Sequence, residues 1–213
     1  MTATPTVTLT ADDSQAAVVL TASGADHYLY EGSSDGTTWY TVRFNDGATA
    51  IDYEAPLVGR SYYRVTGYDA SNVASTPSGP DFIDLSFDGF WLKDPFAPSL
   101  NMPLTVKYAP VKKGRALPQA VHTIRGAKYP VIVSGVRQGM TLRCELYFFT
   151  TDALRKYLAL TTAPRTLLLQ LDTGEQYFGH VLAGEEFSEN EQGDRQGDTV
   201  QELPFQFVEV ARP

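Results

Sequence analysis

Residues 65–80, VTGYDASNVASTPSGP, decide how the chain is divided. An alternating stretch ends here at Gly67 and Tyr68, and the run rich in Ser, Asn and Pro that follows is typical of the exit from a small all-β domain. The later residues have a different character. A chain of 213 residues can form two domains of about 100 residues, each with its own core. We therefore expect a first domain over residues 1–84 and a second unit over residues 85–213.

Composition and charge exclude several classes of protein. The hydrophobic fraction is 43%, and no stretch approaches the roughly 18 consecutive apolar residues of a membrane span. Residues 1–81 carry ten acidic residues against three arginines, which speaks against a nucleic-acid grip by the first domain. Cys144 is the single cysteine, so an internal disulfide is excluded and a small core residue is expected. The start of the chain lacks the features of a signal peptide, and we expect no export by that route.

The first domain shows short stretches of alternating polarity, separated by turn residues every 8 to 12 positions. This rhythm predicts an antiparallel β-sandwich. Tyr28 and Tyr30 should share one face of a strand, and Asp35-Gly36 should form a hairpin turn. The predicted strands cover residues 7–9, 17–20, 27–31, 39–43 and 60–68.

A resemblance to a known family follows from these residues. The segments YLYEGSSDGTTWYTV (28–42) and DYEAPLVGRSYYRVTGYDASN (52–72), with the Ser/Pro-rich exit after them, resemble a fibronectin type III domain. The resemblance covers residues 5–85 and implies a β-sandwich. A non-catalytic module of this kind joined to a second β-rich unit is the layout of a modular structural or adhesive protein.

Residues 85–128 mix aromatic residues with five prolines and predict an extended arm with short strands. Such an arm is too apolar to float freely in water. Two alternatives stay open: it packs on the chain's own second domain, or it reaches a neighbouring subunit. Lys112, Lys113 and Arg115 form a short basic cluster beside a glycine. We expect a solvated loop tip there, with a contact to nucleic acid or to an acidic partner as the alternative.

The second domain becomes regular over residues 129–213. The segments PVIVSGV (130–136) and MTLRCELYFF (140–149) predict a hairpin, and a helix follows over about 151–162 with Thr151 as N-cap and Asp152 in the first turn. Two further strands should flank Asp172-Thr173-Gly174, and the chain should end on a strand, LPFQFVEV (203–210). The predicted fold is a β-sandwich or split barrel with one flanking helix. The helix should bury one stripe of side chains: Leu154, Tyr157, Leu158 and Thr161.

No pattern predicts a catalytic, cofactor or metal site. His27, His122 and His180 lack a metal-type spacing, and we expect surface or strand residues. The acidic loop over residues 184–198 lacks the ligand spacing of a compact calcium loop. A hydrolase is disfavoured because no nucleophile, metal or acid pair stands out. We therefore expect a protein that is not an enzyme.

The second domain carries a further resemblance. WLKDPFAPSLN (91–101), YPVIVSGVRQGMTLRCELYF (129–148), the helix, APRTLLLQL (163–171) and FQFVEVARP (205–213) resemble minor tail proteins of long-tailed bacteriophages, above all those of actinobacteria. The resemblance implies a distal-tail or tail-tube-like domain that closes into rings, placed at the tail tip of the virion. It implies contacts with itself and with the tail tube, hub and tape-measure proteins, and only transient passage of DNA. The family has no enzymatic residues to transfer.

Unpaired strand edges and apolar residues of the arm predict how subunits meet. The strand over 203–210 or the Pro-rich arm should extend a neighbour's sheet. The competing hypothesis is an adhesive module that binds host cell-wall carbohydrate through tyrosines of the first domain, about half of which should be buried: Tyr28, Tyr30, Tyr40, Tyr53, Tyr62, Tyr63 and Tyr68. The candidate subunit contacts are Phe90, Trp91, Phe96, Leu203, Phe205 and Phe207.

Overall fold

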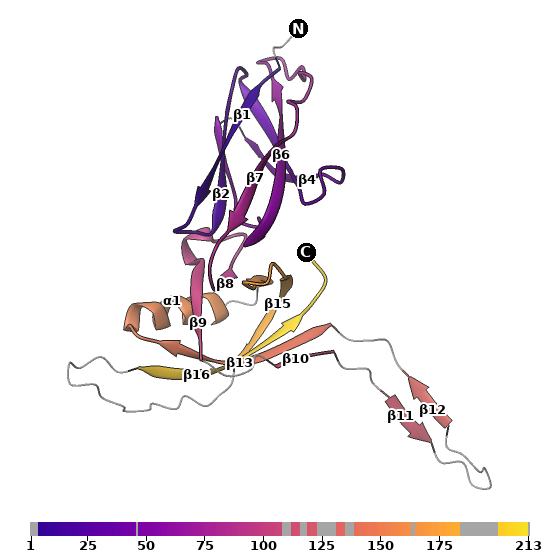
Figure 1. Cartoon of the computed structure of the whole chain (residues 1–213), viewed down its shortest axis with the longest axis vertical. Helices are drawn as coiled ribbons and strands as arrows, with labels where there is room; N and C mark the ends of the chain where they lie inside the picture. Colours follow the sequence, from indigo (N-terminus) through magenta and orange to yellow (C-terminus); the bar gives the residue numbers. More distant parts are fainter. Residues whose placement is uncertain are drawn as a thin grey trace. The chain divides into compact units, whose positions relative to one another are not determined.

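The structure is a computed structural model that describes residues 4–45, 47–107, 112–115, 119–122, 131–134, 139–162, 165–183 and 200–212. These residues are mainly β, arranged in several sheets with one α-helix (Figure 1). The chain falls into two compact units. Unit 1 comprises Met1–Pro103 and Leu168–Gln176, and unit 2 comprises Leu104–Leu167 and Tyr177–Pro213. The expected boundary at residue 84 therefore falls inside unit 1.

Two antiparallel sheets form the first part of unit 1, drawn in indigo to purple in Figure 1. Their strands include all five that the alternation predicts. One sheet has the order β1-β2-β5, with β1 at Thr6–Asp12, β2 at Ala17–Ser23 and β5 at Thr49–Asp52. The other has the order β4-β3-β6-β7, with β4 at Tyr40–Asn45, β3 at His27–Ser33, β6 at Val58–Tyr68 and β7 at Asp81–Ser86.

Period-2 alternation selects the side chains that fill the core of these sheets. Tyr28 and Tyr30 are buried on β3, as predicted, and Tyr63 and Val65 are buried on β6. The same core includes residues well beyond the first sandwich strands, among them Trp91. Its buried members are Ala16, Val18, Leu20, Ala22, Tyr28, Tyr30, Ala50, Ala55, Leu57, Tyr63, Val65, Leu85, Phe87 and Trp91.

The turn predicted at Asp35-Gly36 joins β3 to β4. Gly36 has φ +72°, a left-handed conformation that favours glycine. The Asp35 carboxylate accepts hydrogen bonds from the backbone N–H groups of Thr37 and Thr38, each at 2.7 Å. These donors stabilise the ionised form and hold the pKa of the Asp35 carboxyl well below its usual range.

The first part of the expected arm also belongs to unit 1. Strand β8 (Phe90–Lys93) pairs with β14 (Leu167–Gln170), and the short 3-10 helix η1 (Pro98–Leu100) follows β8. The Lys93 ammonium donates hydrogen bonds to the carbonyl oxygens of Ala16, at 2.6 Å, and Tyr53, at 3.0 Å. The expected packing on the chain's own residues beyond 129 is therefore confirmed for β8 through its pairing with β14, while the Lys93 side chain finds its hydrogen-bond acceptors on the first sandwich.

Unit 2 is built around β13 (Met140–Phe148). One edge of β13 pairs with β16 (Gln201–Glu209), and the other pairs with β10 (Lys112–Arg115) and with the end of β9 (Met102–Val106). Strand β16 pairs on its second edge with β15 (Gln176–Ala183). Short strands in the predicted arm are thus confirmed, and so is the final strand.

The predicted hairpin between residues 130–136 and 140–149 is wrong. Strand β12 (Val131–Ser134) pairs with β11 (Gln119–His122) and not with β13. β13 instead matches β16 from Thr141 to Phe148, a longer register than the four residues of β12 can supply. The hairpin was expected because β12 is the strand just before β13 in sequence. β13 pairs instead with β16, with which it shares a longer alternating stretch.

The predicted helix is confirmed as α1 (Thr151–Thr162), but its cap and its buried face differ in detail. Thr150, not Thr151, is the N-cap, because its hydroxyl oxygen accepts the N–H of Ala153 at 3.2 Å. The helix buries Tyr157 and Leu160, whereas the stripe expected from the sequence omitted Leu160. The Tyr157 ring lies 5.0 Å from that of Phe148 on β13, measured between centroids.

Candidate interaction surfaces

The outer face of the four-stranded sheet carries a group of half-buried and exposed aromatic and charged side chains. Because Tyr63 and Val65 point into the core, the intervening residues of β6 point outward. Cross-strand register brings residues of β3 and β7 beside them. We name this group the aromatic stripe: Glu31, Trp39, Arg60, Tyr62, Arg64, Phe82 and Asp84.

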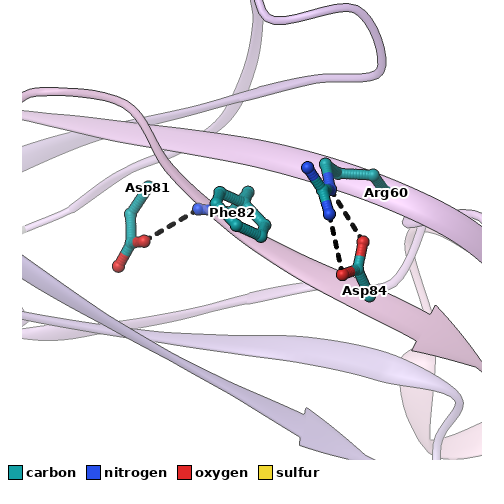
Figure 2. Close-up of polar contacts among 4 residues, drawn as sticks. All are labelled: Arg60, Asp81, Phe82 and Asp84. Carbon is teal, nitrogen blue, oxygen red and sulfur yellow. Dashed lines mark hydrogen bonds and ion pairs between the residues drawn. The ribbon is translucent and has the colours of Figure 1, made fainter.

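One end of the aromatic stripe is a stack of ring, guanidinium and carboxylate. Arg60 donates two hydrogen bonds to Asp84, at 2.8 and 2.9 Å, and its guanidinium carbon lies 4.0 Å from the centroid of the Phe82 ring. Figure 2 shows this pair, with the Asp81 carboxylate accepting the N–H of Phe82 at 2.9 Å. The hydrogen bonds from Arg60 lower the pKa of the Asp84 carboxyl. Phe82 remains 48% exposed.

The other end repeats the same arrangement with different residues. Arg64 donates to both Glu31 carboxylate oxygens, at 2.7 and 3.0 Å, and its guanidinium carbon lies 4.4 Å from the Trp39 ring centroid. The hydrogen bonds to Glu31 raise the pKa of Arg64. Bidentate pairing fixes a planar guanidinium, and stacking on a ring fixes it further. The stripe is therefore a preorganised surface suited to binding.

A buried polar cluster lies on the opposite side of β6. The Asp52 carboxylate accepts hydrogen bonds from the hydroxyls of Tyr40, at 2.9 Å, and Tyr63, at 3.0 Å, and from the N–H of Glu54, at 2.9 Å. Burial raises the pKa of Asp52 and lowers that of Lys93 from 10.5 to about 7. A cavity of about 90 Å³ adjoins this cluster. Lys93 of β8 interacts with Asp52, so this cluster connects β8 to the sandwich. Lys93 and Asp52 are far apart in sequence, and no sequence motif predicts their interaction.

Most of the predicted subunit contacts lie inside the molecule. Leu203, Phe205 and Phe207 are buried in unit 2, and β16 is paired on both edges. Both edges of β16 are paired from Phe205 to Val208, so these residues do not extend a neighbour's sheet, and the Pro-rich arm stays the predicted alternative. Trp91 is also buried, and its indole N–H donates to the Asp88 carbonyl oxygen at 3.2 Å.

Phe96 is the predicted contact that the structure leaves most accessible, at 74% exposed. Its backbone N–H donates to the Asp94 carboxylate at 2.8 Å, and Asp94 is itself buried. The exposed Phe96 ring therefore lies on a turn that is held by a hydrogen bond to a buried carboxylate. Phe90 is half-buried. Both residues stay predictions as subunit contacts.

The tyrosines proposed as sugar platforms divide between core and surface. Tyr28, Tyr30 and Tyr63 are buried and cannot stack on a ligand. Tyr62 and Tyr68 are half-buried, and each lies beside an exposed phenylalanine. The Tyr62 ring is 6.2 Å from that of Phe82, and the Tyr68 ring is 5.5 Å from that of Phe44.

Strands β11 and β12 form a separate two-stranded sheet, which we name the β11–β12 ribbon. Across the described ranges, no third strand pairs with either of its outer edges. Two-stranded sheets are marginally stable in water without further packing. The ribbon therefore has open edges of the kind expected for the strand over 203–210 or for the Pro-rich arm, and β11 belongs to that arm.

The described residues hold no group of three or more His, Cys, Asp or Glu side chains placed to bind a metal. They also contain no helix with the length and apolar composition needed to cross a membrane. The acidic loop over 184–198 lies outside the described residues. Neither a scan of protein-family models nor a search of curated proteins finds a match to this chain.

Proposed function

We propose that this chain is a structural, non-enzymatic protein of a bacteriophage tail tip, which self-associates into a ring or hub. The β11–β12 ribbon is the observation that carries this proposal. An open-edged ribbon gains hydrogen bonds and packing when it joins a neighbour's sheet, and a ring of identical subunits satisfies every such edge. The resemblance of the second domain to minor tail proteins points to the same role.

The first sandwich fits a decorating role in such an assembly. Its sheets of three and four antiparallel strands support the fibronectin type III-like assignment made from the sequence. In this proposal the sandwich faces outward in the virion. The tube, hub and tape-measure proteins are the neighbours, and DNA passes only in transit.

Removal of the β11–β12 ribbon tests self-association. A variant with residues 119–134 replaced by a short Gly/Ser linker should be monomeric by light scattering, whereas the parent should form a hollow ring visible by negative-stain microscopy. No other described strand pairs with the ribbon, so the variant should keep the parent's melting temperature. A matched control, Phe149→Ser, removes an exposed apolar side chain from unit 2 and should still assemble.

The outcome that contradicts the proposal is equally clear. A parent protein that stays monomeric at high concentration, and that mass spectrometry does not find in virion tails, would remove its basis. Assembly that persists without the ribbon would place the contact elsewhere, with the exposed Phe96 turn as the next site to change.

A second candidate function is adhesion to host cell-wall carbohydrate, which the aromatic stripe favours. Phe82 is 48% exposed and offers apolar surface beside Arg60, and fixed Arg–carboxylate pairs offer hydrogen bonds to neighbouring hydroxyl groups. The full chain should sediment with isolated cell walls, and Phe82→Ser should reduce the bound fraction. Phe149→Ser should bind like the parent. Equal retention of parent and Phe82→Ser would argue against this use of the stripe.

A further inference from the structure

A basic corner in unit 2 is the strongest feature that the proposed function does not use. It forms where β10 lies beside β13, around an open cavity of about 430 Å³. The sequence predicts a solvated loop tip here, but the structure places the cluster in strand β10, beside Thr141 and Arg143 of β13. The residues that line the corner are Lys112, Lys113, Gly114, Arg115, Thr141 and Arg143.

The basic corner brings two like charges together across neighbouring strands. Lys112 lies directly opposite Arg143 in the register of the two strands, and like charges at such positions are destabilising. In the part of the chain that the structure describes, Lys112, Arg115 and Arg143 make no ion pair with a carboxylate. An anionic ligand would remove this repulsion.

The shape of the corner favours an oxyanion. No atom lies within 4 Å of the position that a Cβ of Gly114 would take, so a ligand can approach the backbone there. Thr141 lies opposite Gly114 in the register and lines the same cavity. Cations from two neighbouring strands converge on this opening. A phosphate group offers several oxygens to surrounding donors at once, which suits such an arrangement.

We propose that the basic corner binds the phosphate groups of a polyanion, with Lys112 and Arg143, which share one face of the β10–β13 pair, as the contacting cations. The cavity is open, and residues of β10 line it one after another along the strand. An extended chain of phosphates can follow such a row, whereas a single ion would contact only part of it. This site is independent of the β11–β12 ribbon, and a monomeric ribbon variant should keep it.

Binding of a short fluorescent single-stranded oligonucleotide to the full chain tests the site. Lys112→Gln/Arg143→Gln should weaken binding by about tenfold or more at low salt, because two phosphate contacts are lost. The slope of log K against log salt should fall in magnitude by about 1.4. The matched control, Arg155→Gln/Lys156→Gln, makes the same charge change on α1 and should bind like the parent. Melting temperatures of both variants show whether each is folded.

Competition identifies the ligand chemistry. Displacement of the oligonucleotide by tripolyphosphate, but not by polyglutamate, supports a phosphate site. If tripolyphosphate and the oligonucleotide bind with equal affinity per phosphate, the site accepts any phosphate chain. If the oligonucleotide binds more tightly per phosphate, the ligand is a nucleic-acid backbone. Three results overturn the proposal: no binding at low salt, equal loss in both double variants, or stronger displacement by polyglutamate, which would indicate a carboxylate-rich protein partner.

Discussion

Lys93 shows how a single residue of β8 joins distant parts of unit 1. Its ammonium is fully buried, and its two carbonyl partners lie 40 and 77 residues earlier in the chain. Asp52 lies close enough to oppose part of the effect of burial on the pKa of Lys93. From the sequence, Lys93 is one of many polar residues in a Pro-rich segment. Only the folded topology shows that it needs a buried set of acceptors.

The depressed pKa of Lys93 predicts a pH dependence of stability. The unfolded chain binds this proton more tightly than the folded chain, because the pKa is about 7 when folded and 10.5 in its ordinary state. The free energy of unfolding should therefore rise as pH increases from about 7 to 10.5, with about 1.4 kcal/mol for each tenfold difference in proton affinity. Urea titrations of the parent and Lys93→Met across this range measure the effect.

Lys93→Met also leaves two carbonyl groups without a donor, which lowers stability at every pH. That loss is a constant offset, and the test is the difference in slope between the two curves. Parallel curves over this pH range would contradict the lowered pKa of Lys93.

At the scale of elements, the sequence predicts well wherever a local period is long. Five of the seven strands of the first sandwich, the helix α1 and the final strand β16 follow from alternation or helical spacing, whereas β5 and β7 were not predicted. Pairing partners are a different matter, because they depend on residues far apart in the chain. β13 and β16 could not be matched by proximity, and β16 was mistaken for a free edge for the same reason.

The start of α1 gives a prediction at this scale. Thr150→Ala should lower the free energy of unfolding by about 1 kcal/mol, because it removes the side-chain acceptor for the Ala153 N–H. Thr151→Ala is the matched control at an exposed helical position and should change stability far less. Chemical denaturation of the two variants compares them directly. If Thr151→Ala lowered the free energy of unfolding more than Thr150→Ala, Thr151 would be the N-cap, as predicted from the sequence.

For the whole molecule, the division into units is the feature that the sequence describes least well. A composition change near residue 80 suggests a cut there, yet Leu85, Phe87 and Trp91 complete the first core. The aromatic stripe was only partly foreseen. Its tyrosines could be counted from the sequence, but cross-strand register decides that Arg60 covers Phe82 and that Arg64 covers Trp39.

The segment Leu168–Gln176 has a consequence for how such a gene can change. Gln170 and Gln176 donate to the carbonyl oxygens of Ala55 and Glu54, so unit 1 is completed by residues encoded far downstream of its sandwich. Recombination that exchanged only the amino-terminal coding region would separate the carbonyl oxygens of Ala55 and Glu54 from the glutamine side chains that donate to them. Shuffling of this module between genomes should therefore carry both coding segments, or select compensating changes in the downstream one.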